Sequence, residues 1–303
     1  MLIIASRKSR LAMWQAKHVQ SILNQKAPNV NVEILGVSTK GDEVLDRSLS
    51  KIGGKGLFVK ELEVAILENK AHLAVHSLKD VPMILPKGFK LGAILKREDP
   101  RDALVSNKFK CLDEFPKNSI IGTSSLRREF QLKVFRPDFN IVPLRGNLDT
   151  RLKKLDEGRM DGIILAAAGL IRLGSKDRIE QFVSPEILLP AAGQGAIAIE
   201  VLSSNNEVHR LINSLSDSKT SIEVEAERTV SRQLNASCQL PLAVFCERDN
   251  EKEIFHLKAK LAMPDGSKCC FVNLNGNNAN ELANIAVENL IAQGAKKIID
   301  ALR

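Results

Sequence analysis

The sequence is poor in large aromatic residues other than phenylalanine: it contains no tyrosine and a single tryptophan. A protein that binds single-stranded nucleic acid by stacking bases on aromatic rings would depend on its 11 phenylalanines. No apolar run approaches the roughly 18 residues of a membrane span, and residues 163–168 have only the length of a core strand. Residues 1–7 place apolar side chains before charged ones, the reverse of a secretory signal. We therefore expect a cytoplasmic protein without a membrane partner.

Cysteine is also sparse. The five cysteines, at positions 111, 238, 246, 269 and 270, form no C-x-x-C pair and have no histidine pair at zinc spacing. These spacings argue against a disulfide framework and predict no metal site. Cys238 lies in a turn of small residues between a predicted helix and a predicted strand, where a thiol can be exposed and reactive. An unremarkable cysteine is the other interpretation.

The chain does have enough apolar residues, 44%, to bury a substantial core over its 303 positions. Its net charge of +8 is unevenly spread, because residues 1–95 carry an excess of +6, residues 101–190 carry +4, and residues 218–303 carry none. This distribution predicts an anionic partner for the first two thirds. Small polycarboxylates and phosphates fit at least as well as nucleic acid.

Strand and helix patterns alternate through those two thirds. Apolar periodicity predicts strands at 2–5, 32–37 and 71–75 around helices at 9–25 and 58–68. After a charged, proline-containing crossing at 96–101, a second series predicts strands near 103–106, 119–122, 139–143 and 161–166, with helices at 124–134 and 148–157. This alternation is typical of largely parallel sheets with helices on both faces.

The pattern changes after an apolar strand predicted at 196–201. A long helix from Ser218 precedes three strands, 242–247, 254–262 and 268–273, and a closing helix at 278–292. The sequence therefore predicts an α/β fold followed by a smaller, separate α+β domain.

Arginines and hydroxyl residues follow three predicted strands, at the turn into the next helix. Helix starts and guanidinium groups both bind anions, and open α/β sheets bind ligands at the carboxyl ends of their strands. We therefore expect anion contacts here, with solvated surface arginines as the alternative. The residues are Arg7 and Ser9 in the first turn, Thr123, Ser125, Arg127 and Arg128 in the second, and Arg145 and Arg151 in the third.

Ser77, Lys79 and Asp80 follow another buried strand and bring a hydroxyl, an amine and an acid to its carboxyl end. An aspartate that only caps a helix is the alternative, and we expect His76 to be a core histidine with satisfied polar atoms. The glycine-rich segment 53–58 lacks the spacing of a phosphate loop. It is typical of a flexible loop that carries Lys51 and Lys55, or of an ordinary turn.

Taken together, these motifs resemble the porphobilinogen deaminase family, also called hydroxymethylbilane synthases, along the whole chain and in order. The resemblance rests on the segments 7–9, 37–42, 53–63, 74–82, 97–102, 122–128, 144–147, 189–195 and 238–239. It implies a transferase of porphyrin and heme biosynthesis that joins four porphobilinogens head to tail, with loss of ammonia, into hydroxymethylbilane. It also implies a dipyrromethane cofactor that acts as a primer, attached by a thioether to Cys238, and a monomeric enzyme that binds no nucleic acid.

The resemblance assigns a role to each matching residue. Asp80 would be catalytic, stabilising positive charge on the pyrrole and moving protons. Besides Cys238, the cofactor contacts would be Ser77, Lys79, Thr123, Ser125, Arg127 and Arg128. The substrate contacts would be Arg7, Ser9, Arg145, Arg151, Arg172 and Gln194. A mobile loop closing over the active-site cleft would carry Lys51, Lys55 and Phe58.

The family's fold consists of two α/β domains that resemble a periplasmic binding protein and a smaller C-terminal α+β domain. In this chain they correspond to residues 1–95 with 196–213, residues 101–189, and residues 218–303. One departure bears on the cofactor, since Ala236-Ser237 precedes Cys238 where the family usually has two glycines. If those glycines adopt positive φ, the side chains would strain the turn.

Two other classes of function remain to be weighed. A non-catalytic anion-binding protein on the same scaffold would keep the arginines, but it would need neither Asp80 nor Cys238. A nucleic-acid-binding protein would show a steep dependence of DNA affinity on salt.

Overall fold

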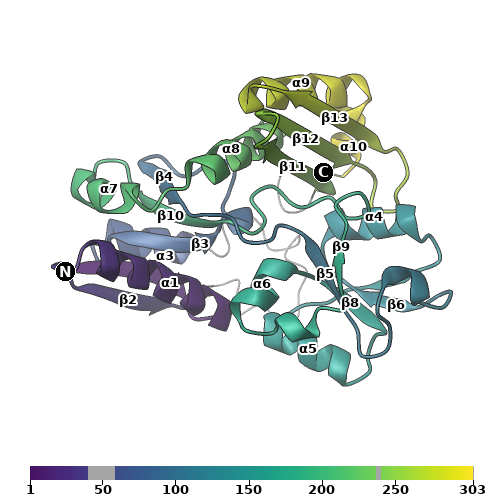
Figure 1. The fold of residues 1–303 in the computed structure, drawn as a ribbon, viewed down its shortest axis with the longest axis horizontal. Coiled ribbons are helices and arrows are strands. Elements are labelled where there is room, and N and C mark those ends of the chain that lie inside the picture. The colour runs from purple at the N-terminus through teal and green to yellow at the C-terminus, as the bar shows by residue number, and fades with distance from the viewer. Residues whose placement is uncertain (40–58, 237–239, 303) are drawn as a thin grey trace. The chain divides into compact units, whose positions relative to one another are not determined.

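The computed structural model describes residues 1–39, 59–236 and 240–302. By its internal contacts the chain divides into two compact units (Figure 1). The first contains Met1–Glu98 and Ala196–Ser221, and the second contains Asp99–Gly195 and Ile222–Arg303. In the described part of the chain no helix is long and apolar enough to cross a membrane.

The first unit is built on a five-stranded sheet in the order β2-β1-β3-β10-β4. The strands β1, β2 and β3 are parallel, and β10 is antiparallel to both of its neighbours, so four of the five strands share one direction. The prediction of a largely parallel sheet is therefore confirmed. The strands are β1 (Leu2–Arg7), β2 (Val32–Val37), β3 (Leu73–Ser77), β4 (Phe89–Ile94) and β10 (Ile197–Leu202).

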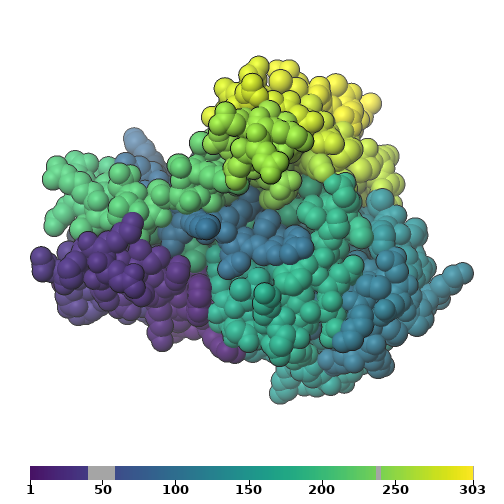
Figure 2. Space-filling model, viewed as in Figure 1, coloured from purple at the N-terminus to yellow at the C-terminus, as the bar shows by residue number. Residues whose placement is uncertain are grey.

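Helices cover both faces of this sheet. Helix α1 (Arg10–Lys26) begins after Ser9, whose hydroxyl accepts the backbone N–H of Ala12. It packs on one face together with α7 (Asn206–Asn213), and α3 (Lys60–Leu67) packs on the other. The segment Ala196–Ser221 returns to the first unit after the second sheet. In the space-filling view its green atoms lie beside the purple atoms of the N-terminal part (Figure 2).

The second unit repeats this topology in the sheet β7-β6-β8-β5-β9. Here β6, β7 and β8 are parallel, and β5 is antiparallel to β8 and β9. The antiparallel strand is the fourth in each sheet, β10 in the first and β5 in the second. Each is the first strand after the chain crosses over from the other unit. The strands are β5 (Asp102–Val105), β6 (Ile120–Gly122), β7 (Asn140–Val142), β8 (Gly162–Ala166) and β9 (Gln181–Val183).

Helices again lie on both faces of the sheet. Helices α5 (Leu148–Asp156) and α6 (Ala167–Arg172) bury apolar residues against one face, and α4 (Leu126–Phe135) covers the other. Each of these helices directly follows a parallel strand, so the turns that carry the predicted anion contacts all lie at carboxyl ends of strands.

The C-terminal part of the second unit has a sheet of its own. Strands β11 (Leu242–Asp249), β12 (Ile254–Leu261) and β13 (Cys270–Gly276) form an antiparallel meander. The accompanying helices are α8 (Ser218–Gln233), α9 (Ala279–Ala292) and α10 (Ala295–Ala301), and α9 packs on β12 and β13. The predicted α+β character of this part is confirmed, and the division of the chain into three domains remains a prediction.

Candidate active site

The carboxyl ends of β1 and β3 form one pocket in the first unit. Arg7 ends β1 and Ser9 caps α1, while Ser77 ends β3 and leads into a 3-10 turn, Leu78–Asp80. All four predicted residues, Arg7, Ser9, Ser77 and Asp80, line a pocket of about 60 Å³. The structure therefore brings together two motifs that lie about 70 residues apart in the chain.

Asp80 is the exposed carboxylate of this pocket. The backbone N–H of Val81 donates to the carbonyl of Leu78 and closes the turn, which leaves the Asp80 side chain in solvent. The preceding Lys79 is half-buried. An exposed carboxylate beside an arginine can stabilise a cation and can accept a proton from a bound molecule.

Gln15 is a pocket residue that the sequence analysis missed. It lies buried on the inner face of α1, where its Nε2 donates to Ser77 Oγ at 2.8 Å. This bond fixes the end of β3 against α1 and orients the Ser77 hydroxyl. The sequence did contain a signal for this role, since Gln15 is a polar residue on the apolar face of the helix predicted at 9–25.

His76 is buried, as predicted, and its Nε2 lies 2.9 Å from Glu200 Oε2. It also lines the pocket that contains Asp80, which the sequence analysis did not anticipate. Its partner Glu200 lies in β10, in an otherwise apolar strand, and was missed as well.

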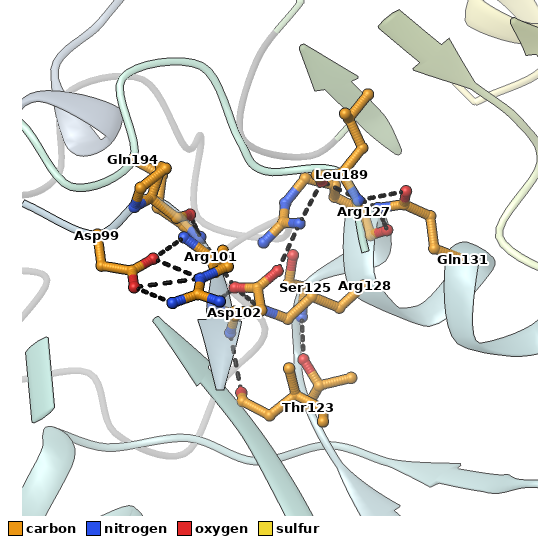
Figure 3. Close-up of polar contacts among 12 residues, drawn as sticks. Asp99, Arg101, Asp102, Thr123, Ser125, Arg127, Arg128, Gln131, Leu189 and Gln194 are labelled. Carbon is orange, nitrogen blue, oxygen red and sulfur yellow. Dashed lines mark hydrogen bonds and ion pairs between the residues drawn. The ribbon is translucent and has the colours of Figure 1, made fainter. Parts of the chain in front are cut away.

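In the second unit, Arg127 and Arg128 converge on one buried carboxylate, Asp102 (Figure 3). Arg127 Nη1 lies 2.7 Å from Asp102 Oδ2, and Arg128 donates to Oδ1 through Nε at 3.0 Å and Nη2 at 2.8 Å. We call these three residues the arginine cluster. Burial alone would raise the pKa of Asp102, but the two guanidinium groups outweigh burial and hold that pKa far below its usual value.

Neighbouring groups fix the arginine cluster further. Arg127 Nη1 donates to the carbonyl of Leu189 at 2.7 Å, and Gln131 accepts the Leu189 N–H at 2.9 Å. Gln194, predicted as a substrate contact, is fully buried and donates from Nε2 to Asp102 Oδ1 at 3.0 Å. Two positive charges thus face one negative charge, which leaves one positive charge in excess.

The hydroxyls of the second predicted turn lie beside the arginine cluster (Figure 3). Ser125 is at the N-cap of α4, and its backbone N–H donates to the buried Thr123 Oγ1 at 3.2 Å. Between them, Ser124 Oγ donates to the Leu144 carbonyl and accepts the Leu144 N–H, both at 3.0 Å. Ser124 therefore joins the second predicted turn to the third, a structural role that the sequence did not reveal.

Of the remaining predicted arginines, Arg145 lies in the turn after β7, Arg151 lies in α5 and Arg172 ends α6. Arg145 is half-buried, and Arg151 Nε donates to the carbonyl of Gly146 at 2.8 Å. Arg172, near the end of α6, donates to the carbonyl of Gly195 at 2.7 Å. These bonds set the position of the Arg151 and Arg172 side chains within the unit.

Four predicted residues, Lys51, Lys55, Phe58 and Cys238, lie outside the described residues. The chain is described up to Ala236, two residues before Cys238. Asn235 has φ of 50°, and the backbone N–H groups of Asn235 and Ala236 donate to the carbonyls of Arg232 and Ser231. This is a Schellman motif, in which the left-handed residue is Asn235 and not Ala236. No cluster of three or more histidine, cysteine or acidic side chains suited to a metal occurs among residues 1–39, 59–236 and 240–302.

Two sheets with the same pattern of strand directions, and with arginine and hydroxyl side chains at the carboxyl ends of their strands, define an α/β protein suited to binding anions. A family profile described as "Porphobilinogen deaminase, dipyromethane cofactor binding domain" matches residues 2–210, and "Porphobilinogen deaminase, C-terminal domain" matches residues 221–292. The chain belongs to the porphobilinogen deaminase family, whose members are transferases of tetrapyrrole biosynthesis.

Individual relatives agree over the full length. The porphobilinogen deaminase of Thiobacillus denitrificans is 51% identical over 99% of this chain and 98% of its own, and that of Chromobacterium violaceum is 50% identical over 99% and 97%. Among solved structures, a periplasmic substrate-binding protein of an ABC transporter from Coxiella burnetii has a TM-score of 0.47 at 12% identity, covering 73% of this chain and 94% of its own. The methionine binding protein MetQ has a TM-score of 0.45 at 13% identity, covering 75% and 94%.

Proposed function

We propose that this enzyme joins four porphobilinogen molecules head to tail, with loss of one ammonia per unit, and that one water then releases the linear tetrapyrrole as hydroxymethylbilane. The observation that supports this most directly is the pocket where Asp80 lies with Arg7, Ser9 and Ser77. Porphobilinogen carries two carboxylates and an aminomethyl group on a pyrrole. An arginine suits its carboxylates, and a carboxylate suits the cationic carbon that forms when ammonia leaves.

Asp80 has two tasks in this proposal. When the C–N bond breaks, its electron pair leaves with ammonia, and the Asp80 carboxylate stabilises the positive charge that spreads over the pyrrole. A new C–C bond then forms to the free α-carbon of the acceptor pyrrole, and that carbon must lose a proton. Asp80, exposed and unhindered by a buried ion pair, accepts this proton and returns it to solvent or to the ammonia.

The residues of the second unit fit a polyanionic cofactor. The arginine cluster holds two guanidinium groups against one carboxylate, so it can bind a further carboxylate without a buried excess of negative charge. We propose that Arg127, Arg128, Thr123 and Ser125, with Ser77 and Lys79, bind the dipyrromethane carboxylates, and that Cys238 forms the thioether. When bound, the dipyrromethane would supply the first acceptor pyrrole and would remain on the enzyme after the product is released.

We assign Arg7, Ser9, Arg145, Arg151, Arg172 and Gln194 to substrate carboxylates, and Lys51, Lys55 and Phe58 to the predicted loop. We further propose a cytoplasmic enzyme that acts as a monomer. Light scattering on the purified protein tests the last point, with a mass near 33.4 kDa plus the cofactor expected. A mass twice as large would contradict it.

The intact mass of the purified protein, with peptide mapping, is the first test. We expect an excess equal to two porphobilinogens less two ammonias on the Cys238 peptide, and loss of this excess in Cys238→Ser. Pigment retained covalently by Cys238→Ser would mean that another residue forms the bond. An unmodified wild type that gains no mass with porphobilinogen would favour the non-catalytic anion-binding protein.

Asp80→Asn tests the catalytic assignment. Because it removes only a charge, we expect kcat for hydroxymethylbilane formation to fall by about 10²–10⁴-fold. Stability should change by no more than about 0.5 kcal/mol, since the side chain is exposed. Asp177→Asn is the matched control, an exposed aspartate in another 3-10 turn, and should keep wild-type turnover. Wild-type turnover by Asp80→Asn would remove Asp80 from the proposed role.

A further inference from the structure

Glu200 is a fully buried carboxylate in an apolar part of the first sheet. The residues that pair beside it from strand to strand are all uncharged: Leu35, Ala5, Ala74 and Leu91. A buried carboxylate without partners would cost several kcal/mol. Glu200 therefore needs polar partners on its own face of the sheet.

One partner is His76, the pocket residue whose Nε2 lies 2.9 Å from Glu200 Oε2. The other oxygen, Glu200 Oε1, is buried and has no N–H donor or hydroxyl donor among the described residues. Helix α3 packs over Ala5 and Ala74 and brings a second buried carboxyl group, that of Glu63, to this part of the sheet. Two neighbouring carboxyl groups can share a hydrogen bond only if one of them holds a proton.

We propose that Glu63 and Glu200 share one proton and act together as positioning residues for His76 in the wall of the Asp80 pocket. With that proton present, Glu200 carries the negative charge that orients the imidazole, and Glu63 donates to the remaining oxygen. Without that proton, the two carboxylates repel each other between α3 and the sheet. The hydrogen bond by which Glu200 orients His76 then weakens.

The pKa of Glu63 agrees with this geometry. Burial first, and then the charge and hydrogen bond of Glu200, raise the pKa of Glu63 to about 7, although Lys60 on the same helix opposes the shift. The facing residues of β1 and β4, Ala5 and Leu91, are uncharged, so the charges acting on Glu63 among the described residues are those of Glu200 and Lys60. Because the folded protein holds this proton more tightly than the unfolded chain does, the proton's contribution to stability is full below about pH 4.5 and is lost as the pH rises through about 7.

Glu63→Gln tests the proposal, because glutamine donates an N–H to Glu200 at every pH. This test rests on the proposed turnover of porphobilinogen. The wild-type kcat/KM should decrease above about pH 7, and the kcat/KM of the variant should not. At pH 8 the wild type should have lost about tenfold of its kcat/KM relative to its maximum, and the variant should have lost little. The melting temperature should also fall less between pH 5 and pH 8 in the variant. Glu68→Gln, which changes an exposed glutamate just beyond α3, should match the wild type.

A measurement on the wild-type holoenzyme does not depend on any variant. A ¹³C NMR titration of the glutamate carboxyl carbons should show one glutamate that titrates near pH 7. Its absence, or an unchanged alkaline limb in Glu63→Gln, would overturn the proposal. If Glu63→Gln changed the pH dependence of the melting temperature but not that of kcat/KM, Glu63 and Glu200 would have only a structural role. That result would overturn the positioning role. A wild type that forms no product at any pH would instead contradict the proposed function.

Discussion

At the scale of single residues, Asp102 decides whether two arginines can be buried. A guanidinium removed from water without a counter-charge costs several kcal/mol, and both Arg127 and Arg128 are almost completely buried. Asp102 is the carboxylate bonded to both. The cluster therefore combines a structural ion pair with one further positive charge available to a ligand.

Asp102→Asn should be strongly destabilising because it leaves two buried guanidinium groups without a counter-charge. We expect the free energy of unfolding, measured in urea, to fall by about 3–5 kcal/mol. Asp156→Asn, which breaks the partly exposed pair with Arg178, is the matched control and should cost at most about 1 kcal/mol. Equal losses in the two variants would contradict the role of Asp102.

The pH dependence of that variant follows from the depressed pKa of Asp102. A carboxylate whose pKa is lower in the folded protein stabilises the fold above its ordinary value of 3.8, and this stabilisation is lost as the pH falls further. The stability difference between wild type and Asp102→Asn should therefore be full near pH 7 and shrink below about pH 4. A difference that grows toward acid pH would contradict the assignment.

The sequence revealed one partner of each buried pair but not the other. Arg127 and Arg128 belong to a recognisable turn motif, and His76 directly follows the strand predicted at 71–75. Asp102 lies 25 residues before Arg127, and Glu200 lies 124 residues after His76. Each pair forms only when separate strands assemble into a sheet, so local pattern does not predict it.

At the scale of secondary-structure elements, the end of α8 determines the backbone conformation of Asn235 and Ala236. The left-handed conformation falls on Asn235, a residue type that tolerates it better than most. Ala236 accordingly fills the next position of the Schellman motif without positive φ among the described residues. The strain expected from replacing the family's first glycine is therefore absent at this position.

Two glycine substitutions test whether the left-handed residue is Asn235 or Ala236, because they should have different effects on stability. Asn235→Gly should leave stability unchanged or raise it slightly, since glycine adopts positive φ without strain. Ala236→Gly should lower stability by about 0.4–1 kcal/mol, since it only adds freedom to the unfolded chain. Thermal unfolding measures both, and stabilisation by Ala236→Gly would place the left-handed residue at 236 instead.

Long periodic elements such as α1, α8 and α9 were predictable, and so were several short apolar strands, but other short elements were not. The edge strands β4 and β9 and the helices α6, α7 and α10 lack a sustained pattern of their own. The strand predicted at 161–166 ends where β8 ends, at Ala166, but the helix α6 that begins at Ala167 was not predicted. No glycine or proline marks that boundary, so the packing of the whole unit determines it.

At the scale of the whole molecule, the positive charge of +8 should draw the anionic substrate toward the enzyme. Raising the ionic strength from about 0.01 M to 0.1 M shortens the Debye length from about 30 Å to about 10 Å. We expect KM for porphobilinogen to rise severalfold over this range, with a smaller change in kcat. Sucrose at matched osmolality controls for general solvent effects, and a constant KM in salt would contradict the prediction.

The order of strands in the two sheets also has a consequence for synthesis on the ribosome. All five strands of the second sheet come from one continuous stretch, 102–183, and can assemble as soon as that stretch has emerged. The first sheet cannot, because β4 is joined to β3 through β10, which is translated only after the whole second sheet. The nascent chain must therefore keep its earliest strands in an unfinished sheet, with β4 unpaired, while the later sheet closes first.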